Sequence, residues 1–237
     1  MARLIFYDNE HIYEVDGEEY PSVSEISRFA SREIYGEVNQ FNLDNACSRG
    51  SAVHKATEIL DKYGEVECAE DIESYIRAYV KFRKDFGVKD YAFIEKPLAS
   101  EKSKFAGTID RIYKVDETFS EKVMELCKDT ICVGENGKVE KVKVVKKPPI
   151  DSFAIIDIKS SSVVQNVLAL IQLNGYDKLV KDNNLGNVGC LFILHLEKDG
   201  NYKLLPIELN ENLFNACLTL HNALKKKKRV KKENNNG

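Results

Sequence analysis

The sequence predicts an α/β fold in a single domain, with a mixed central β-sheet flanked by helices. The 237 residues are 43% hydrophobic and include only five prolines, which is typical of an ordinary globular chain. Some segments repeat apolar residues with the helical period of 3.6, whereas others are short strand-like runs. The predicted order is helices, hairpin, strand, helix, hairpin and helix. This order is not a regular βαβ series, so we expect parallel and antiparallel strands in one sheet.

The first part of the chain predicts a hairpin followed by helices. Residues 3–20 have apolar flanks around Asp16-Gly17, a strong turn signal. In "PSVSEISRFA", Ser22 precedes Glu25 by three residues, the pattern of a helix N-terminal capping box. Two further helices with 3.6-residue apolar spacing are predicted over 44–63 and 70–86.

The second part predicts the rest of the sheet. Residues 91–99 and 105–115 flank a polar loop, which indicates an antiparallel pair. Residues 116–149 are charged and irregular, and we interpret them as an insertion that is partly strand around "KVEKVKVV". The remaining predictions are a buried strand in "SFAIIDIKSS", a helix over about 162–181, a hairpin of "VGCLFILHLE" with "NYKLLPIEL", and a final helix from near Glu211 into the basic tail.

Composition excludes some classes of protein. No apolar run approaches the roughly 18 residues that suggest a membrane span. The opening "MARLIFYDNEHIYEVDG" meets acids and a turn too early for a secretory signal, so we expect a cytoplasmic protein without membrane contact. The six cysteines include no Cys-x-x-Cys and are expected to be reduced structural thiols. Cys127 and Cys132 make a weak metal candidate.

Charge is unevenly distributed along the chain. Residues 225–233 carry seven positive charges and one negative charge, so this stretch contributes +6 to a net charge of −3. The remaining chain therefore carries −9. An acidic body with a basic tail suits contact with a polyanion, although a solvated terminus explains a lysine run equally well. We assign residues 1–224 to the domain and 225–237 to a flexible basic tail.

Two charges stand out in the strand "AIIDIKSS". Asp157 and Lys159 are two residues apart, so their side chains point to the same face of a strand that is otherwise apolar. Isolated charges inside a core cost several kcal/mol each. The two side chains therefore pair with each other, lie at a wet strand end, or face a cation and an anionic ligand.

A second lone acid, Asp110, lies in the strand "FAGTIDRI". Gly107 nearby removes side-chain bulk, which permits close approach of a ligand. If the 91–99/105–115 hairpin turns about Lys102, Glu95 lies opposite Ile109 and diagonal to Asp110. Acids from separate strands offer the hard oxygen ligands that Mg²⁺ or Mn²⁺ selects.

Three more polar residues lie on predicted helices: His54 in "RGSAVH", and Gln172 with Tyr176 in "QLNGY". Each alone is a weak signal, because packed or surface helices carry such residues routinely. In order along the chain, however, these segments resemble the motifs of RecB-like nucleases in the PD-(D/E)xK superfamily. The motifs are "RGSAVH", "GTID", "DIK" and "QLNGY". The segment "HIYEVDGEEYPSVSEI" is similar to the start of many phage-type exonucleases of that group, and the resemblance covers roughly residues 11–209.

The resemblance implies a restriction-endonuclease-like core with a metal site at one end of the sheet. It makes Asp110, Asp157 and Lys159 catalytic, with Lys159 holding the attacking water, and it makes Gln172 and Tyr176 substrate-positioning residues. The metal ligands that it implies are His54, Asp110, Asp157, the carbonyl of Ile158 and, as an extra ligand, Glu95.

The implied activity is a metal-dependent DNA exonuclease acting from DNA ends in recombination, repair or phage DNA metabolism. An endonuclease or junction resolvase on the same core, or a non-catalytic DNA-binding subunit, is the alternative. The expected cofactor is Mg²⁺ or Mn²⁺. Some relatives in this superfamily bind an iron–sulfur cluster through four cysteines, three of which are grouped near the C-terminus. Only Cys190 and Cys217 lie late in this chain, so such a cluster is not expected. Expected partners are DNA and either a second copy or a recombination protein, in the host cytoplasm if the gene is phage-borne.

Overall fold

The chain folds around a mixed β-sheet, as the sequence predicts, and this sheet has seven strands. The computed structural model describes residues 3–8, 10–35, 40–126, 131–133, 139–141, 146–161, 164 and 166–235. Within these ranges only the backbone is described at 31–35, 40–47, 131–133, 139–141 and 226–235. The side chains of Cys127 and Cys132 therefore lie outside the described part, as do those of the basic residues after 225.

The main sheet has the strand order β4-β5-β8-β9-β10-β6-β7. Two neighbouring pairs, β8 with β9 and β10 with β6, are parallel, and the other pairs are antiparallel. The strands are β4 (Phe93–Ser100), β5 (Phe105–Lys114), β6 (Ile131–Val133), β7 (Val139–Lys141), β8 (Phe153–Lys159), β9 (Val188–Leu196) and β10 (Tyr202–Ile207).

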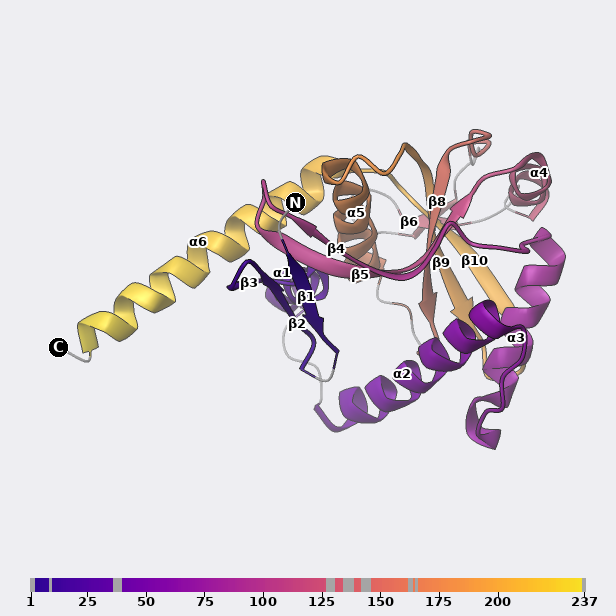
Figure 1. Cartoon of the computed structure of the whole chain (residues 1–237), viewed down its shortest axis with the longest axis horizontal. Coiled ribbons are helices and arrows are strands. Elements are labelled where there is room, and N and C mark those ends of the chain that lie inside the picture. Colours follow the sequence, from indigo (N-terminus) through magenta and orange to yellow (C-terminus); the bar gives the residue numbers. More distant parts are fainter. Residues whose placement is uncertain are drawn as a thin grey trace.

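Six helices are described, and they cover both faces of the sheet (Figure 1). One face packs against α1, α5 and α6, and the other packs against α2, α3 and α4. The helices are α1 (Val23–Tyr35), α2 (Gln40–Tyr63), α3 (Glu70–Phe86), α4 (Glu117–Leu126), α5 (Asn166–Asp182) and α6 (Glu211–Asn235). Within the described part, no helix combines the length and the apolar character that crossing a membrane requires.

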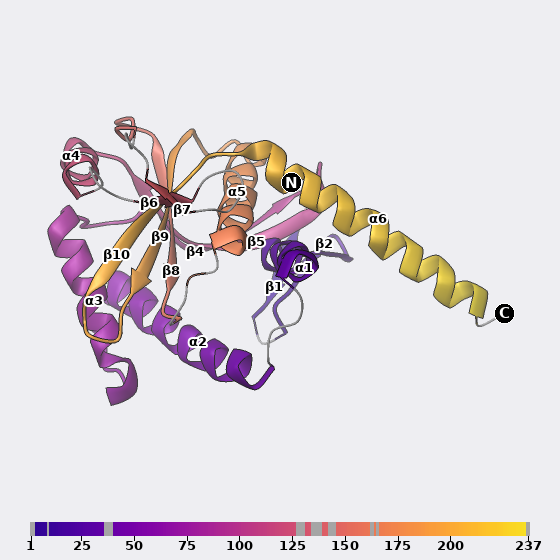
Figure 2. The ribbon, with the colours of Figure 1, turned by 180° about the vertical axis from the view of Figure 1, so that it is seen from behind.

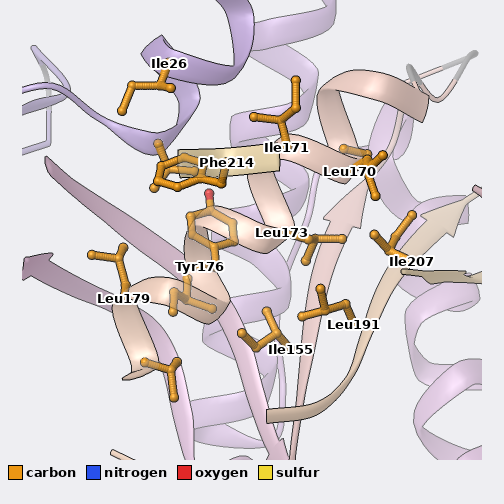
Figure 3. Close-up of a cluster of buried hydrophobic side chains, with 14 of the residues drawn as sticks. Ile26, Ile155, Leu170, Ile171, Leu173, Tyr176, Leu179, Leu191, Ile207 and Phe214 are labelled. Carbon is orange, nitrogen blue, oxygen red and sulfur yellow. The ribbon is translucent and has the colours of Figure 1, made fainter. Parts of the chain in front are cut away.

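Strand β8 is buried on both faces because its side chains alternate between two cores. Ile155 contributes to the core under α5, whereas Ile156 and Ile158 contribute to the core under α3. Figure 3 shows the first of these cores, in which Tyr176 of α5 lies among aliphatic side chains from the sheet and from α1 and next to Phe214 of α6. β8 is thus packed on both faces, which positions the charges near its end.

The N-terminal segment forms three strands rather than the single predicted hairpin. They are β1 (Leu4–Tyr7), β2 (Ile12–Val15) and β3 (Glu18–Tyr20), paired in that order in a separate sheet. The predicted turn is confirmed between β2 and β3, where Asp16 and Gly17 both have positive φ, 49° and 84°. The predicted cap of α1 is also confirmed, since the Glu25 N–H donates to Ser22 Oγ at 2.9 Å.

The segment 116–149 differs from the expectation of an irregular insertion. It begins with α4, whose first turn is capped by Asp116 Oδ1 accepting from the Phe119 N–H at 2.8 Å. Phe119 and Val123, one turn apart, are buried against the α3 side of the sheet. The predicted strand is present as β7, and β6 joins the main sheet through β10. The segment is therefore built partly into the core.

Candidate metal centre

The predicted acids of β5 and β8 lie where these two strands part. The antiparallel pairing of the strands runs from Lys114↔Phe153 to Arg111↔Ile156, so Asp110 and Asp157 are the next residues on each side. Beyond this point the backbone of β8 no longer pairs with the backbone of β5. Instead, the Ile158 N–H donates to the Asp110 side chain, at Oδ2, at 2.7 Å. Neighbouring elements bring further polar groups to this point, where the two strands part.

Three of the predicted ligands converge at this point. His54 of α2, Glu95 of β4 and Asp110 of β5 each place one potential ligand atom within 4.8 Å of the other two. His54 Nδ1 lies 3.7 Å from Glu95 Oε1 and 3.5 Å from Asp110 Oδ2. Asp110 is buried, and the other two are half-buried. Two carboxylates and an imidazole form a donor set that could hold a metal ion.

Glu95 reaches the group through a register that differs by one residue from the predicted one. Lys96, not Glu95, pairs with Ile109, and Ile94 pairs with Arg111, so Glu95 lies directly opposite Asp110. Its backbone is in the left-handed region with φ of 45°, which interrupts the pairing. This conformation costs a non-glycine residue on the order of 1 kcal/mol and is concentrated at functional sites.

The second nitrogen of His54 anchors the ring. Nε2 donates to the carbonyl of Ile158 at 2.9 Å, so Nδ1 faces the carboxylates. A ring held in this way is typical of histidines that bind metals through the other nitrogen. The Ile158 carbonyl, predicted as a ligand, is in this structure the acceptor that orients His54. Burial lowers the pKa of His54, but Asp110 and Glu95 outweigh it and raise the pKa to about 9.

Asp157 and Lys159 form an ion pair, the first of the three alternatives left open by the sequence. Lys159 Nζ lies 2.5 Å from Asp157 Oδ2. Asp157 is 1% exposed, and its Oδ1 has no hydrogen-bond partner among the described residues. Burial and the charge of Asp110 raise the pKa of Asp157 to about 6, against the opposing effect of Lys159. Burial lowers the pKa of Lys159, but Asp157 and Asp110 raise it above its ordinary value.

Gln172 and Tyr176 lie together on α5 beside these charges. Gln172 Nε2 donates to the Tyr176 hydroxyl at 2.8 Å, and both side chains are buried. Burial, and then the charges of Asp157 and Asp110, raise the pKa of Tyr176 well above its ordinary value. The phenol therefore stays protonated at neutral pH.

Gly107 does not leave space for a ligand, contrary to the expectation from the sequence. A Cβ at this position would lie 3.1 Å from Val23 Cγ2 and 3.2 Å from Tyr176 Cε1. Val23 of α1 and Tyr176 of α5 fill the space that a side chain at position 107 would occupy. Both helices therefore pack closely on β5.

Arg111 is the principal residue that the sequence analysis did not single out. It is fully buried, and it donates to Asp61 Oδ2 at 2.6 Å and to Glu95 Oε1 at 2.8 Å. The signal was present, because an arginine inside the strand "FAGTIDRI" must have a buried anionic partner. The sequence does not identify that partner, since Asp61 lies 50 residues away on α2.

The donor chemistry fits a metal ion. Two carboxylates and one oriented imidazole could hold such an ion between them. A buried carboxylate oxygen without a hydrogen-bond partner among the described residues, as at Asp157, is unusual in folded proteins, and a bound water or ion is one way to satisfy it. His54, Glu95 and Asp110 would form the centre of such a site, and Asp157 adjoins it.

Comparison with known proteins does not assign a family. No family model matches the sequence, and no curated protein matches it significantly. The nuclease resemblance therefore stays a prediction from the motifs, and the site must be interpreted from its own chemistry.

Proposed function

We propose that this protein is a Mg²⁺- or Mn²⁺-dependent deoxyribonuclease that hydrolyses phosphodiester bonds and degrades DNA from its ends. The observation that carries the proposal is the convergence of His54, Glu95 and Asp110 beside the Asp157–Lys159 pair. Three carboxylates and a lysine at one point of a sheet are costly in a structural core, but they suit a phosphate ester bound next to a cation. The order of the motifs along the chain supports the same class.

In this proposal, His54, Glu95 and Asp110 hold the cation, and Asp157 adds its unpaired oxygen to the ligand set. A bound divalent ion would supply Lewis-acid stabilisation of the negative charge that develops on phosphate oxygens. Asp110 Oδ2 also accepts from the Ile158 N–H, which keeps its carboxylate in one orientation.

Lys159 acts as a hydrogen-bond donor and a positive charge rather than as a base, because its pKa is raised above the ordinary lysine value. It orients the attacking water and offsets charge on the phosphorane-like transition state. Tyr176 accepts a hydrogen bond from Gln172, so its own hydroxyl hydrogen remains to donate to a phosphate oxygen of the substrate. In this proposal, Gln172 and Tyr176 position the bound substrate.

The substitution Lys159→Ala tests the catalytic assignment. We expect it to lower the rate of Mg²⁺-dependent degradation of end-labelled linear DNA by at least about 100-fold, the usual effect of removing one preorganised donor. Asp157→Ala should have a comparable effect. Lys203→Ala is the matched control, because Lys203 is an exposed lysine of β10 paired with Glu197, and it should retain the parental rate. A Lys159→Ala protein that digests DNA as fast as the parent would contradict the proposal.

The choice of substrate form separates the alternatives. The purified protein is incubated with linear and closed circular DNA in Mg²⁺, Mn²⁺ or EDTA. Digestion of the linear form alone supports an exonuclease, whereas cutting of circles indicates an endonuclease or resolvase. Binding without cutting in either ion indicates a non-catalytic DNA-binding subunit, and the proposed activity is then wrong.

A further inference from the structure

The buried guanidinium of Arg111 makes more contacts than a simple ion pair requires. Nη1 donates to Glu95 Oε1 at 2.8 Å and also to the backbone carbonyl of Asp110 at 2.7 Å. Nη2 donates to Thr57 Oγ1 at 3.0 Å. Nε donates to Asp61 Oδ2 at 2.6 Å and to the Tyr79 hydroxyl at 3.3 Å. The rings of Tyr79 and Tyr91 lie 5.9 and 5.7 Å from its central carbon. The group is therefore held in one orientation.

These contacts connect all three elements that carry the candidate ligands. Thr57 and Asp61 follow His54 by three and seven residues, so they lie on the same face of α2. Glu95 belongs to β4, and the Asp110 carbonyl belongs to β5. A single side chain thus links the helix of the imidazole ligand to the strands of both carboxylate ligands. The contact with Glu95 also holds a residue whose backbone is in the left-handed region.

We propose that Arg111 is a positioning residue that assembles His54, Glu95 and Asp110 in their metal-binding arrangement before a cation arrives. This inference rests on the metal site of the proposed function, which it deepens by naming what organises that site. A planar guanidinium reaches several acceptors in fixed directions, whereas an ammonium is a compact point charge. The role is therefore specific to arginine and not merely to a positive charge at this place.

The direction of the change in metal affinity distinguishes a positioning role of Arg111 from a purely electrostatic one. A positive charge close to a cation site opposes cation binding by Coulomb repulsion. If Arg111 acted only through its charge, a variant that keeps the charge would bind metal as the parent does, and one that loses it would bind metal more tightly. If Arg111 positions the ligands, a variant that keeps the positive charge but loses the planar guanidinium binds metal more weakly.

The test is a calorimetric titration of the full-length Arg111→Lys variant with Mn²⁺. Melting temperatures are measured separately in EDTA. We expect Mn²⁺ affinity to fall by about 10- to 100-fold, as for other residues that orient metal ligands. Arg83→Lys is the matched control, because Arg83 contacts the same Asp61 at 3.0 Å but touches neither Glu95 nor Asp110 in the described contacts. Its affinity should stay within about twofold of the parent.

Thr57→Val provides a second variant if Arg111→Lys does not fold, because at nearly constant volume it removes the Nη2 contact, together with the hydrogen bond from Thr57 Oγ1 to the His54 carbonyl at 2.9 Å within α2. We expect a several-fold loss of Mn²⁺ affinity in a variant that still folds, with a melting temperature in EDTA lowered by a few degrees because one buried donor loses its acceptor. Unchanged or tighter Mn²⁺ binding in the folded variant overturns the positioning role, as does a parent that binds no Mn²⁺. A parent that binds Mn²⁺ but leaves DNA intact refutes the proposed activity alone, and the titration still decides the role of Arg111.

Discussion

At the scale of single residues, His54 lies where a proton and the proposed cation would compete. Its Nδ1 faces Glu95 and Asp110, and these carboxylates raise its pKa to about 9 against the lowering effect of burial. The side chain is 28% exposed, so solvent screens part of this attraction. In the metal-free protein the imidazolium provides the positive charge between two acids. The stability that it contributes is complete below the unfolded pKa of 6.5 and is lost as the pH rises through about 9.

Metal binding should therefore strengthen with pH. The proton on His54 must leave before Nδ1 can bind a cation, so we expect the apparent Kd for Mn²⁺ to fall by up to about tenfold per pH unit between pH 7 and 9. Asp157, with a pKa of about 6, is already ionised over this range. His54→Gln is the control, and it should bind more weakly with little dependence on pH. A parental Kd that is flat from pH 7 to 9 would contradict the assignment of His54 as a ligand.

At the scale of elements, the close packing of α5 on the sheet and its neighbours sets the position of Gln172 and Tyr176. A Cβ on Gly175 would lie 2.6 Å from Phe214 Cε2 of α6 and 2.9 Å from Val23 Cγ1 of α1. Glycine at this position lets three helices meet over β5 and β8, and Figure 3 shows Phe214 directly beside Tyr176. Helix packing and the site are therefore connected through α5.

Gly175→Ala should destabilise the protein by about 1–3 kcal/mol, because the added methyl group overpacks a closed contact. Urea denaturation monitored by circular dichroism measures this change. Gly50→Ala is a matched control in α2, where a Cβ meets nothing within 4 Å. It should stabilise the fold by about 0.5–1 kcal/mol through helix propensity alone. Equal effects of the two substitutions would show that the contact with Phe214 is not tight.

At the scale of the whole molecule, charge and shape divide the chain into an acidic body and a basic C-terminal end. In both views the C-terminal part of α6 extends away from the sheet (Figures 1 and 2). Its N-terminal part contributes Phe214 and Leu218 to the core. His221 Nε2 lies 3.0 Å from Glu25 Oε1 of α1 and so also holds this part of the helix. Residues 225–233 carry a net charge of +6, so this end is suited to a polyanion.

Removing residues 225–237 should weaken DNA binding and reduce its salt dependence, by about 0.9 in the slope of log K against log salt for each lost phosphate contact. The fold should persist, because the lost ion pair of Lys225 with Glu25 spans 3.8 Å at an exposed position. The matched control removes only the uncharged residues 234–237. If binding and slope are the same in both truncations and the parent, the tail has no role in DNA contact.

Much of the architecture could be predicted because it depends on local patterns. The apolar patterns located α3 and strands β4, β5, β8, β9 and β10, and the Asp16-Gly17 turn and the Ser22 cap followed from short-range chemistry. Helix α4 was missed because the charges of 116–149 obscured the buried pair Phe119 and Val123. A one-residue difference in the β4–β5 register was beyond the sequence, since it is set at the turn, where Ser100 pairs with Phe105, and the sequence does not fix where that turn is centred.

The sequence by itself determined that β8 is a buried strand carrying Asp157 and Lys159 on one face, and that further acids and a histidine lie on other elements. Only the tertiary structure decided which of these meet: His54, Glu95 and Asp110 converge, and Asp157 pairs with Lys159 beside them. It also revealed Arg111 as the link between α2, β4 and β5. The physical reason is that periodicity sets the direction of a side chain within its own element, whereas strand register and helix packing set the distances between elements.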